Sequence, residues 1–219
     1  MRLLFINGLI DGGTAAGLVV LWYLCLAGYN HRRGTKALRW LEAACSGRAR
    51  VLEAHWMGAS GLQAHLGFAA HWFENARVTI RLLPRPLPVQ WMLSRWHKQR
   101  ETLTFEADLD YAPNLQLEVL RHRWVSQNDN KIIRDSRDWT VVRPGPIMFT
   151  TCSQWKQEVP PIVNTLITTR GHNLLSVRFR PESPHLAATI DLEAIADEQA
   201  AAGFLDVLRE LAGSSTSRQ

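Results

Sequence analysis

The chain has 219 residues, enough for one domain of ordinary size with an appendage, and 46% of them are hydrophobic, which excludes a disordered protein. The net charge is +5, but residues 1–100 hold thirteen Lys and Arg against four Asp and Glu, whereas residues 101–219 hold twelve against sixteen. A basic N-terminal half indicates an anionic partner surface, lipid headgroups or nucleic acid, unless its arginines only solvate exposed faces. The three cysteines lack the spacing of a disulfide framework or a zinc site, which favours a reducing compartment.

The first predicted element is a transmembrane helix over residues 12–30, which would contact the lipid bilayer. The residues from Gly12 to Tyr29 carry no formal charge, and a helix of that length reaches roughly 27 Å, enough to cross a hydrocarbon core. The middle of the run is apolar on every side and lacks the polar stripe of a soluble surface helix. Residues 1–11 are interrupted by polar residues and glycine, so we expect a short N-terminal interfacial segment there.

Two alternatives remain open for this run, a cleaved signal peptide and a buried helix of a soluble protein. A signal peptide needs small residues before its cleavage site, and Leu26 occupies such a position if cleavage follows Gly28. A membrane span is therefore the favoured interpretation.

A basic juxtamembrane helix is predicted over residues 31–47, with Gly47 as its stop. Its cations follow the span directly, and by the positive-inside rule they place the N-terminus outside and the bulk of the chain in the cytoplasm, at the cell membrane. These cations are Arg32, Arg33, Lys36 and Arg39.

The remainder, residues 48–213, is expected to form one α+β domain with a mainly antiparallel sheet. Apolar and polar residues alternate cleanly in four segments, as in strands that have one buried and one solvated face. These segments are 76–83, 101–111, 174–180 and 185–192. Weaker strand patterns occur at 49–57, 115–125, 137–143 and 146–151.

Helices are expected to cover one face of this sheet. The clearest is a C-terminal helix over 196–213, in which apolar residues recur at helical spacing before Gly213. A second helix is predicted within 153–171 and a third over 59–74. The tail, residues 214–219, is predicted to be disordered.

Residues 84–100 have a distinctive pattern of prolines followed by a basic, tryptophan-bearing amphipathic stretch. In a tethered protein such a stretch can rest on anionic headgroups; the alternative is that its apolar side docks on the sheet. The predicted membrane-surface contacts are Arg32, Arg33, Lys36 and Arg39 from the first helix, and Arg95, Trp96, Lys98 and Arg100 from this stretch.

Three carboxylates, on Glu106, Asp108 and Asp110, alternate along one predicted strand. This spacing suits a divalent cation or an acid/base pair, but it equally suits cross-strand ion pairs with the arginines of neighbouring strands. The ion pairs are the favoured interpretation. Cys152 could be a nucleophile at a helix start, although a lone cysteine is more commonly packed in a core.

We therefore expect a single-pass membrane-anchored protein whose cytoplasmic domain has a non-enzymatic binding or scaffolding role at the membrane. No catalytic residue, metal ligand or cofactor is assigned, and no motif identifies the protein partner. The alternatives are a membrane-tethered hydrolase using the acidic strand 106–110, and a nucleic-acid-binding module. Nucleic acid is not the expected partner, because the aromatic-basic stretch 121–125 is too short for an RNA-binding motif.

Overall fold

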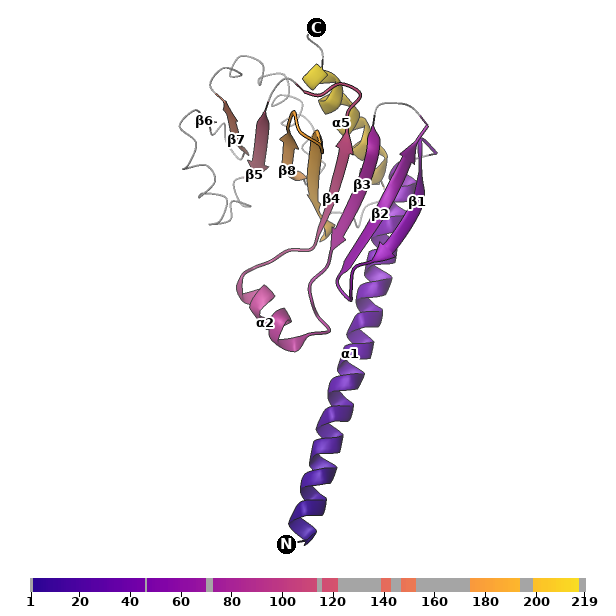
Figure 1. Cartoon of the computed structure of the whole chain (residues 1–219), viewed down its shortest axis with the longest axis vertical. Helices are drawn as coiled ribbons and strands as arrows, with labels where there is room; N and C mark the ends of the chain where they lie inside the picture. The colour runs from indigo at the N-terminus through magenta and orange to yellow at the C-terminus, as the bar shows by residue number, and fades with distance from the viewer. Residues whose placement is uncertain are drawn as a thin grey trace.

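The computed structural model describes residues 2–45, 47–69, 73–113, 116–121, 139–142, 147–152, 174–193 and 199–216. It has a long N-terminal helix that projects from an α+β domain (Figure 1).

The helix α1 (Arg2–Cys45) is continuous. It contains no proline, and so nothing removes a hydrogen bond from its interior. The boundaries predicted after residues 11 and 30 are therefore not marked by any break in the helix. Gly47, the predicted stop, lies just beyond the observed end and has φ +77°, a conformation that glycine adopts without steric cost.

The domain is built on one sheet with the strand order β1-β2-β3-β4-β9-β8-β5-β7-β6, and every neighbouring pair is antiparallel. The antiparallel sheet expected from the alternating pattern is thus confirmed. Its strands are β1 (Ala49–Trp56), β2 (Gly61–Phe68), β3 (Glu74–Arg81), β4 (Thr102–Asp108), β5 (Leu117–Arg121), β6 (Trp139–Val142), β7 (Ile147–Cys152), β8 (Leu174–Phe179) and β9 (Leu186–Asp191).

The helix predicted over 59–74 is wrong, because this segment contains strand β2. Leu62, Ala64 and Leu66 are buried and alternate with half-buried Gln63 and His65, which is the period of a strand. β2 lies between β1 and β3 and pairs with both, so its backbone is fully engaged in the sheet.

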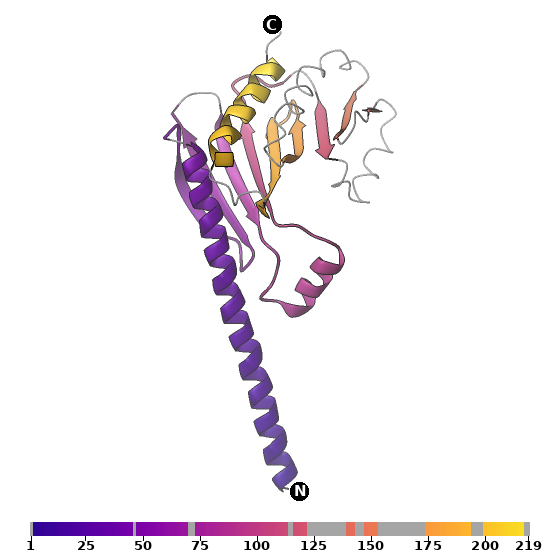
Figure 2. The same ribbon diagram turned by 180° about the vertical axis from the view of Figure 1, so that it is seen from behind.

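The buried faces of the strands pack on the C-terminal part of α1 and on α5 (Gln199–Thr216), which lie over the same side of the sheet (Figure 2). Trp40 of α1 and Phe105 of β4 both contact Phe204 of α5, at ring-centroid distances of 5.7 and 6.4 Å. The predicted C-terminal helix is confirmed, and it runs into the segment predicted as the tail. Complete coverage of this face stays a prediction, because the predicted helix at 153–171 lies outside the described residues.

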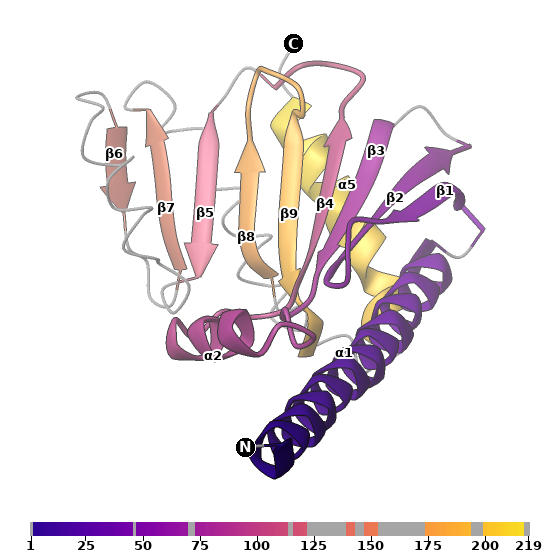
Figure 3. The same cartoon turned by 60° about the horizontal axis from the view of Figure 1, so that its bottom comes forward.

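The connection between β3 and β4 contains α2 (Pro88–Trp96), which lies at the end of the sheet from which α1 projects (Figure 3). Proline opens the helix, where its missing N–H costs nothing. The amphipathic helix expected within 84–100 is therefore present.

Gly34 marks a close approach of α1 to β1, and replacing it with Ala is expected to destabilise the domain. A Cβ at this position would lie 2.5 Å from Cη2 of Trp56, whose ring is held by stacking on His31. The overpacking costs about 1–3 kcal/mol, whereas Gly28→Ala is the matched control because its Cβ would meet nothing within 4 Å. Urea unfolding of both variants in mild detergent measures this difference, and equal stabilities would contradict it.

Candidate membrane-facing surface

The apolar run of α1 is exposed. From Leu18 to Leu24 every large apolar side chain is at least 41% exposed, although these side chains point to all sides of the helix. The segment is long and apolar enough to cross a membrane, and none of it is buried in the chain. This finding contradicts the alternative of a buried helix in a soluble protein.

A second exposed apolar surface lies on α2. Val89, Met92, Leu93 and Trp96 follow one another at helical spacing and are all exposed, Trp96 to 83%. They are therefore not docked on the sheet, which was the alternative interpretation of this stretch. Ser94 is buried and Trp91 is half-buried, so another side of α2 faces the rest of the protein.

The α2 segment is fixed to α1 by contacts with Trp22 and Tyr29. The rings of Trp22 and Trp91 lie 6.1 Å apart, and the Trp22 indole N–H donates a hydrogen bond to the Arg85 carbonyl oxygen at 3.2 Å. The Arg85 guanidinium lies 5.0 Å from the centre of the Tyr29 ring. The segment before α2 is thus held against the second half of the apolar run.

Arg85 also contacts Glu101, whose carboxylate is buried, with a side chain only 4% exposed. It forms ion pairs with Arg33 of α1, at 2.5 Å, and with Arg85. It also accepts a hydrogen bond from the backbone N–H of Leu83 at 3.1 Å. Two cations and a backbone donor compensate for the removal of this carboxylate from water.

Asn30 completes this junction and is fully buried. Its side-chain amide donates hydrogen bonds to the carbonyl oxygens of Ala59 and Leu83, both at 3.0 Å, and its carbonyl accepts one from Arg85 at 3.1 Å. Both the donor and the acceptor ends of the amide are therefore satisfied. The junction fixes α1 to the loops β1–β2 and β3–α2.

The cations predicted to contact the membrane fall into two groups. Arg33 pairs with Glu101, and Arg100 pairs with buried Asp191 at 2.7 Å, so both have partners within the domain. Arg95 is exposed and lies 5.9 Å from the centre of the Trp91 ring. The other predicted contacts are all exposed: Arg32, Lys36, Arg39, Trp96 and Lys98.

Sequence reasoning did not single out Trp22, Asn30, Arg85 or Glu101 as members of one cluster. Trp22 and Arg85, which share a hydrogen bond, are 63 residues apart in the sequence, so no local spacing reveals the cluster. The available signal was that Glu101 is the first acid after a long basic stretch.

The acidic strand forms cross-strand pairs. The Arg77 guanidinium donates to the Glu106 carboxylate at 2.9 Å, and the Asn75 amide donates to Asp108 at 3.0 Å. Burial raises the pKa of Asp108, but hydrogen bonds from Asn75 and Ser183 and the nearby His185 outweigh it and leave the pKa below its usual value. Asp110 lies beyond the end of β4. Glu106 therefore forms the expected cross-strand ion pair with an arginine, whereas Asp108 accepts its hydrogen bond from a neutral amide.

Replacing Asp108 with Ala is expected to cost about 0–1 kcal/mol of unfolding free energy at pH 7, as for other surface polar pairs. Because the folded pKa is lowered, the stabilisation is present above the unfolded value, near 3.8, and is lost as pH falls through the folded pKa. Unfolding curves of both proteins at neutral and acidic pH measure this difference. A larger loss at acidic pH than at neutral pH would contradict the assignment.

Two cysteines differ in environment. Cys45 is buried in the core, where burial and the nearby Glu42 raise its pKa to about 11, so it stays a thiol. Cys25 is exposed on the apolar run of α1. The side chain of Cys152 lies outside the described residues. Within the described ranges, no three His, Cys, Asp or Glu side chains come close enough to hold a metal ion.

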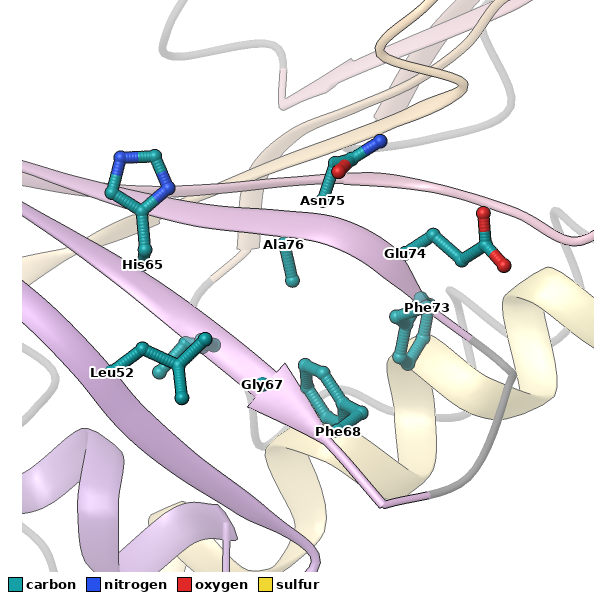
Figure 4. A pocket seen from close by; sticks show the side chains of 9 residues that line it. Leu52, His65, Gly67, Phe68, Phe73, Glu74, Asn75 and Ala76 are labelled. Atoms are coloured by element: carbon teal, nitrogen blue, oxygen red, sulfur yellow. The ribbon is translucent and has the colours of Figure 1, made fainter.

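A pocket of about 440 Å³ opens between β1, β2 and β3 (Figure 4). Leu52, Phe68 and Phe73 supply its apolar walls, and His65 and Glu74 add polar groups. Glu74 pairs in register with Asp108, at the end of β4 away from α2. The pocket thus lies far from the exposed apolar surfaces of α1 and α2.

In comparisons with known proteins, no family model matches the chain and no curated protein is similar to it.

Proposed function

We propose that the chain is a single-pass membrane protein whose α+β domain has a non-enzymatic binding or scaffolding role at the bilayer surface. The observation that carries this proposal is that the two parts of the continuous helix α1 have different environments. Its apolar part is exposed, whereas Ala37, Trp40, Leu41 and Ala44 of the same helix belong to the domain core. Water is a poor solvent for such an exposed run, and a bilayer removes it from water.

A cleaved signal sequence meets the same criteria of length and composition. Two contacts favour a retained anchor. Trp22 bonds to the Arg85 carbonyl and packs on Trp91, and both contacts would be lost if the chain were cut after Gly28. Tyr29 and Asn30 follow without a break in the helix and already belong to the junction with the domain.

We further propose that the N-terminus lies outside the cell membrane and that residues 30–219 are cytoplasmic. The basic segment of α1 follows the apolar run, and the α2 connection lies at the same, C-terminal end of that run; this excess of cations at one end favours the cytoplasm. The exposed members of this set would contact anionic headgroups: Arg32, Lys36, Arg39, Arg95 and Lys98. We also propose that helices cover the whole of one face of the sheet.

A C-terminal tag tests the location directly. Membranes are washed at alkaline pH, and protease access to the tag is compared between intact cells and inverted vesicles. Retention of the chain, with cleavage only in inverted vesicles, supports the proposal. Release by the wash contradicts the anchor, and cleavage from the cell exterior contradicts the orientation.

Removing Arg32 and Lys36 together, as the double Gln variant, is expected to insert part of the population in the opposite orientation, because positive charges close to a span set its topology. The matched control removes two exposed arginines that are distant in sequence, Arg81 and Arg180, and should leave the topology unchanged. The same protease assay measures both fractions. Equal behaviour of the two variants would remove the support for a charge-determined orientation.

A hydrolase using Glu106 and Asp108 is the second candidate, and a nucleic-acid-binding module is the third. Cation binding by the intact protein, lost in Asp108→Ala, would favour the hydrolase. A steep fall in RNA or DNA affinity with rising salt would favour nucleic-acid binding, because counterion release drives that interaction.

A further inference from the structure

The contacts of Trp22 show which part of α1 lies beside α2. The Trp22 ring packs on Trp91 of α2, and its N–H bonds to the connection that precedes α2. Trp22 lies seven residues before Tyr29, which is about 10 Å along a helix. α2 therefore lies beside the uncharged run of α1 and not beyond its end (Figures 1 and 3).

The surface of α2 suits the boundary between headgroups and acyl chains. Val89, Met92, Leu93 and Trp96 form an exposed apolar stripe, and Arg95 and Lys98 add exposed cations near its C-terminal end. Interfacial helices combine such a stripe with cations that interact with anionic lipids. Tryptophan itself prefers this layer, because its ring is apolar and its N–H is polar.

We infer that α2 lies in the headgroup layer of the bilayer that α1 crosses, and that the hydrocarbon boundary on the domain side lies near Trp22 instead of Tyr29. The inference rests on the proposed function, because α2 meets lipid at this height only if α1 spans the membrane. Its partner is the bilayer itself, with anionic lipid opposite Arg95 and Lys98.

The dimensions of a bilayer agree with this position. Each headgroup layer is about 5–8 Å thick, and interfacial helices bury their apolar side about 5–10 Å deep. The descent of about 10 Å from Tyr29 to Trp22 spans such a layer and slightly more. Tyr29 then lies at the aqueous surface of the headgroups, which Arg32 still reaches. In this placement Lys36 and Arg39 lie about 10 and 15 Å beyond Tyr29, so the headgroup contacts of the proposed function narrow to Arg32, Arg95 and Lys98.

The hydrocarbon-crossing part of α1 then shifts toward the N-terminus. About 20 helical residues are needed to cross the core, and counted back from Trp22 they extend to about residue 3. Position 11 falls about 16 Å from Trp22, near the midplane, where an ionised carboxylate is disfavoured. The four apolar side chains of α2 that leave water in the same placement offset that cost.

Depth-dependent fluorescence quenching tests this placement. The full chain, with Cys25 and Cys152 replaced by Ser, is reconstituted in phosphatidylcholine vesicles containing phosphatidylglycerol, and buried Cys45 stays unlabelled. Single cysteines carry the fluorophore at Gly13 and Val20 of α1, at Met92 of α2, and at Tyr111 as the control. Tyr111 is exposed and follows the end of β4 that points away from α2. Nitroxide lipids quench near either the headgroup or the chain end.

The inference predicts that the headgroup-proximal nitroxide removes most of the Met92 fluorescence and leaves that of Tyr111 unchanged. The chain-end nitroxide should quench Gly13 more than Val20, because the midplane lies nearer position 13. Met92 behaving like Tyr111, or deeper quenching at Val20, would overturn the inference while leaving α1 in the bilayer. Absence of quenching at both α1 positions would instead contradict the proposed function.

Discussion

Replacing Glu101 with Gln is expected to lower the unfolding free energy of the full chain by about 3–5 kcal/mol, the largest effect of any polar substitution considered. The Glu101 carboxylate is buried between Arg33 and Arg85. Its neutral replacement leaves two cations without their counter-ion in a partly desolvated junction. Equilibrium urea unfolding in mild detergent, followed by far-ultraviolet circular dichroism, measures the loss.

Glu106→Gln is the matched control for this substitution. Glu106 also pairs with an arginine, but its side chain is 28% exposed and that of Arg77 is 42% exposed, so water screens the pair. The expected cost is about 0–1 kcal/mol. Similar losses for the two variants would show that Glu101 is not the anion that holds the junction together.

Replacing Trp40 with Ala is expected to cost about 3–5 kcal/mol, because it removes a large buried side chain and leaves a cavity. Trp40 is 7% exposed and packs on Phe204 at the contact between α1 and α5. The domain should therefore unfold at a lower urea concentration, while the chain stays in the membrane after an alkaline wash.

Trp96→Ala separates packing from membrane contact. The residue type is the same, but Trp96 is 83% exposed, so its loss should change the unfolding free energy in detergent by no more than about 0.5 kcal/mol. A loss as large as that of Trp40→Ala would contradict the placement of Trp96 on the surface of the domain.

Much of the fold was predictable, because strands with one buried face leave a period of two in the sequence. Val78, Ile80, Leu103 and Phe105 alternate with polar residues and are fully buried. The pattern over β2 was missed because its two glycines and its alanine give a weak apolar signal in a segment also compatible with a helix. The order of the strands depends on long-range pairing that local periodicity does not record.

The candidate membrane surface was only partly predictable. The local sequence pattern was enough to identify the apolar run and the amphipathic stretch, because hydrophobicity and helical periodicity can be recognised within a short segment. It could not show which cations are already paired inside the domain, as Arg33 and Arg100 are. Nor could it place Trp91 beside Trp22, because that contact joins residues far apart in the sequence.

The continuity of α1 has a mechanical consequence. A helix of 44 residues is a rod of about 66 Å, and this rod enters the domain core without a flexible hinge of the kind that proline supplies. Transmembrane helices tilt by about 20° on average and change this tilt to match the thickness of the bilayer. In the proposed anchoring, a domain on a loose tether would keep its orientation, whereas this sheet would tilt together with its helix. The angle at which the domain presents its faces would therefore vary with the thickness of the membrane that holds it.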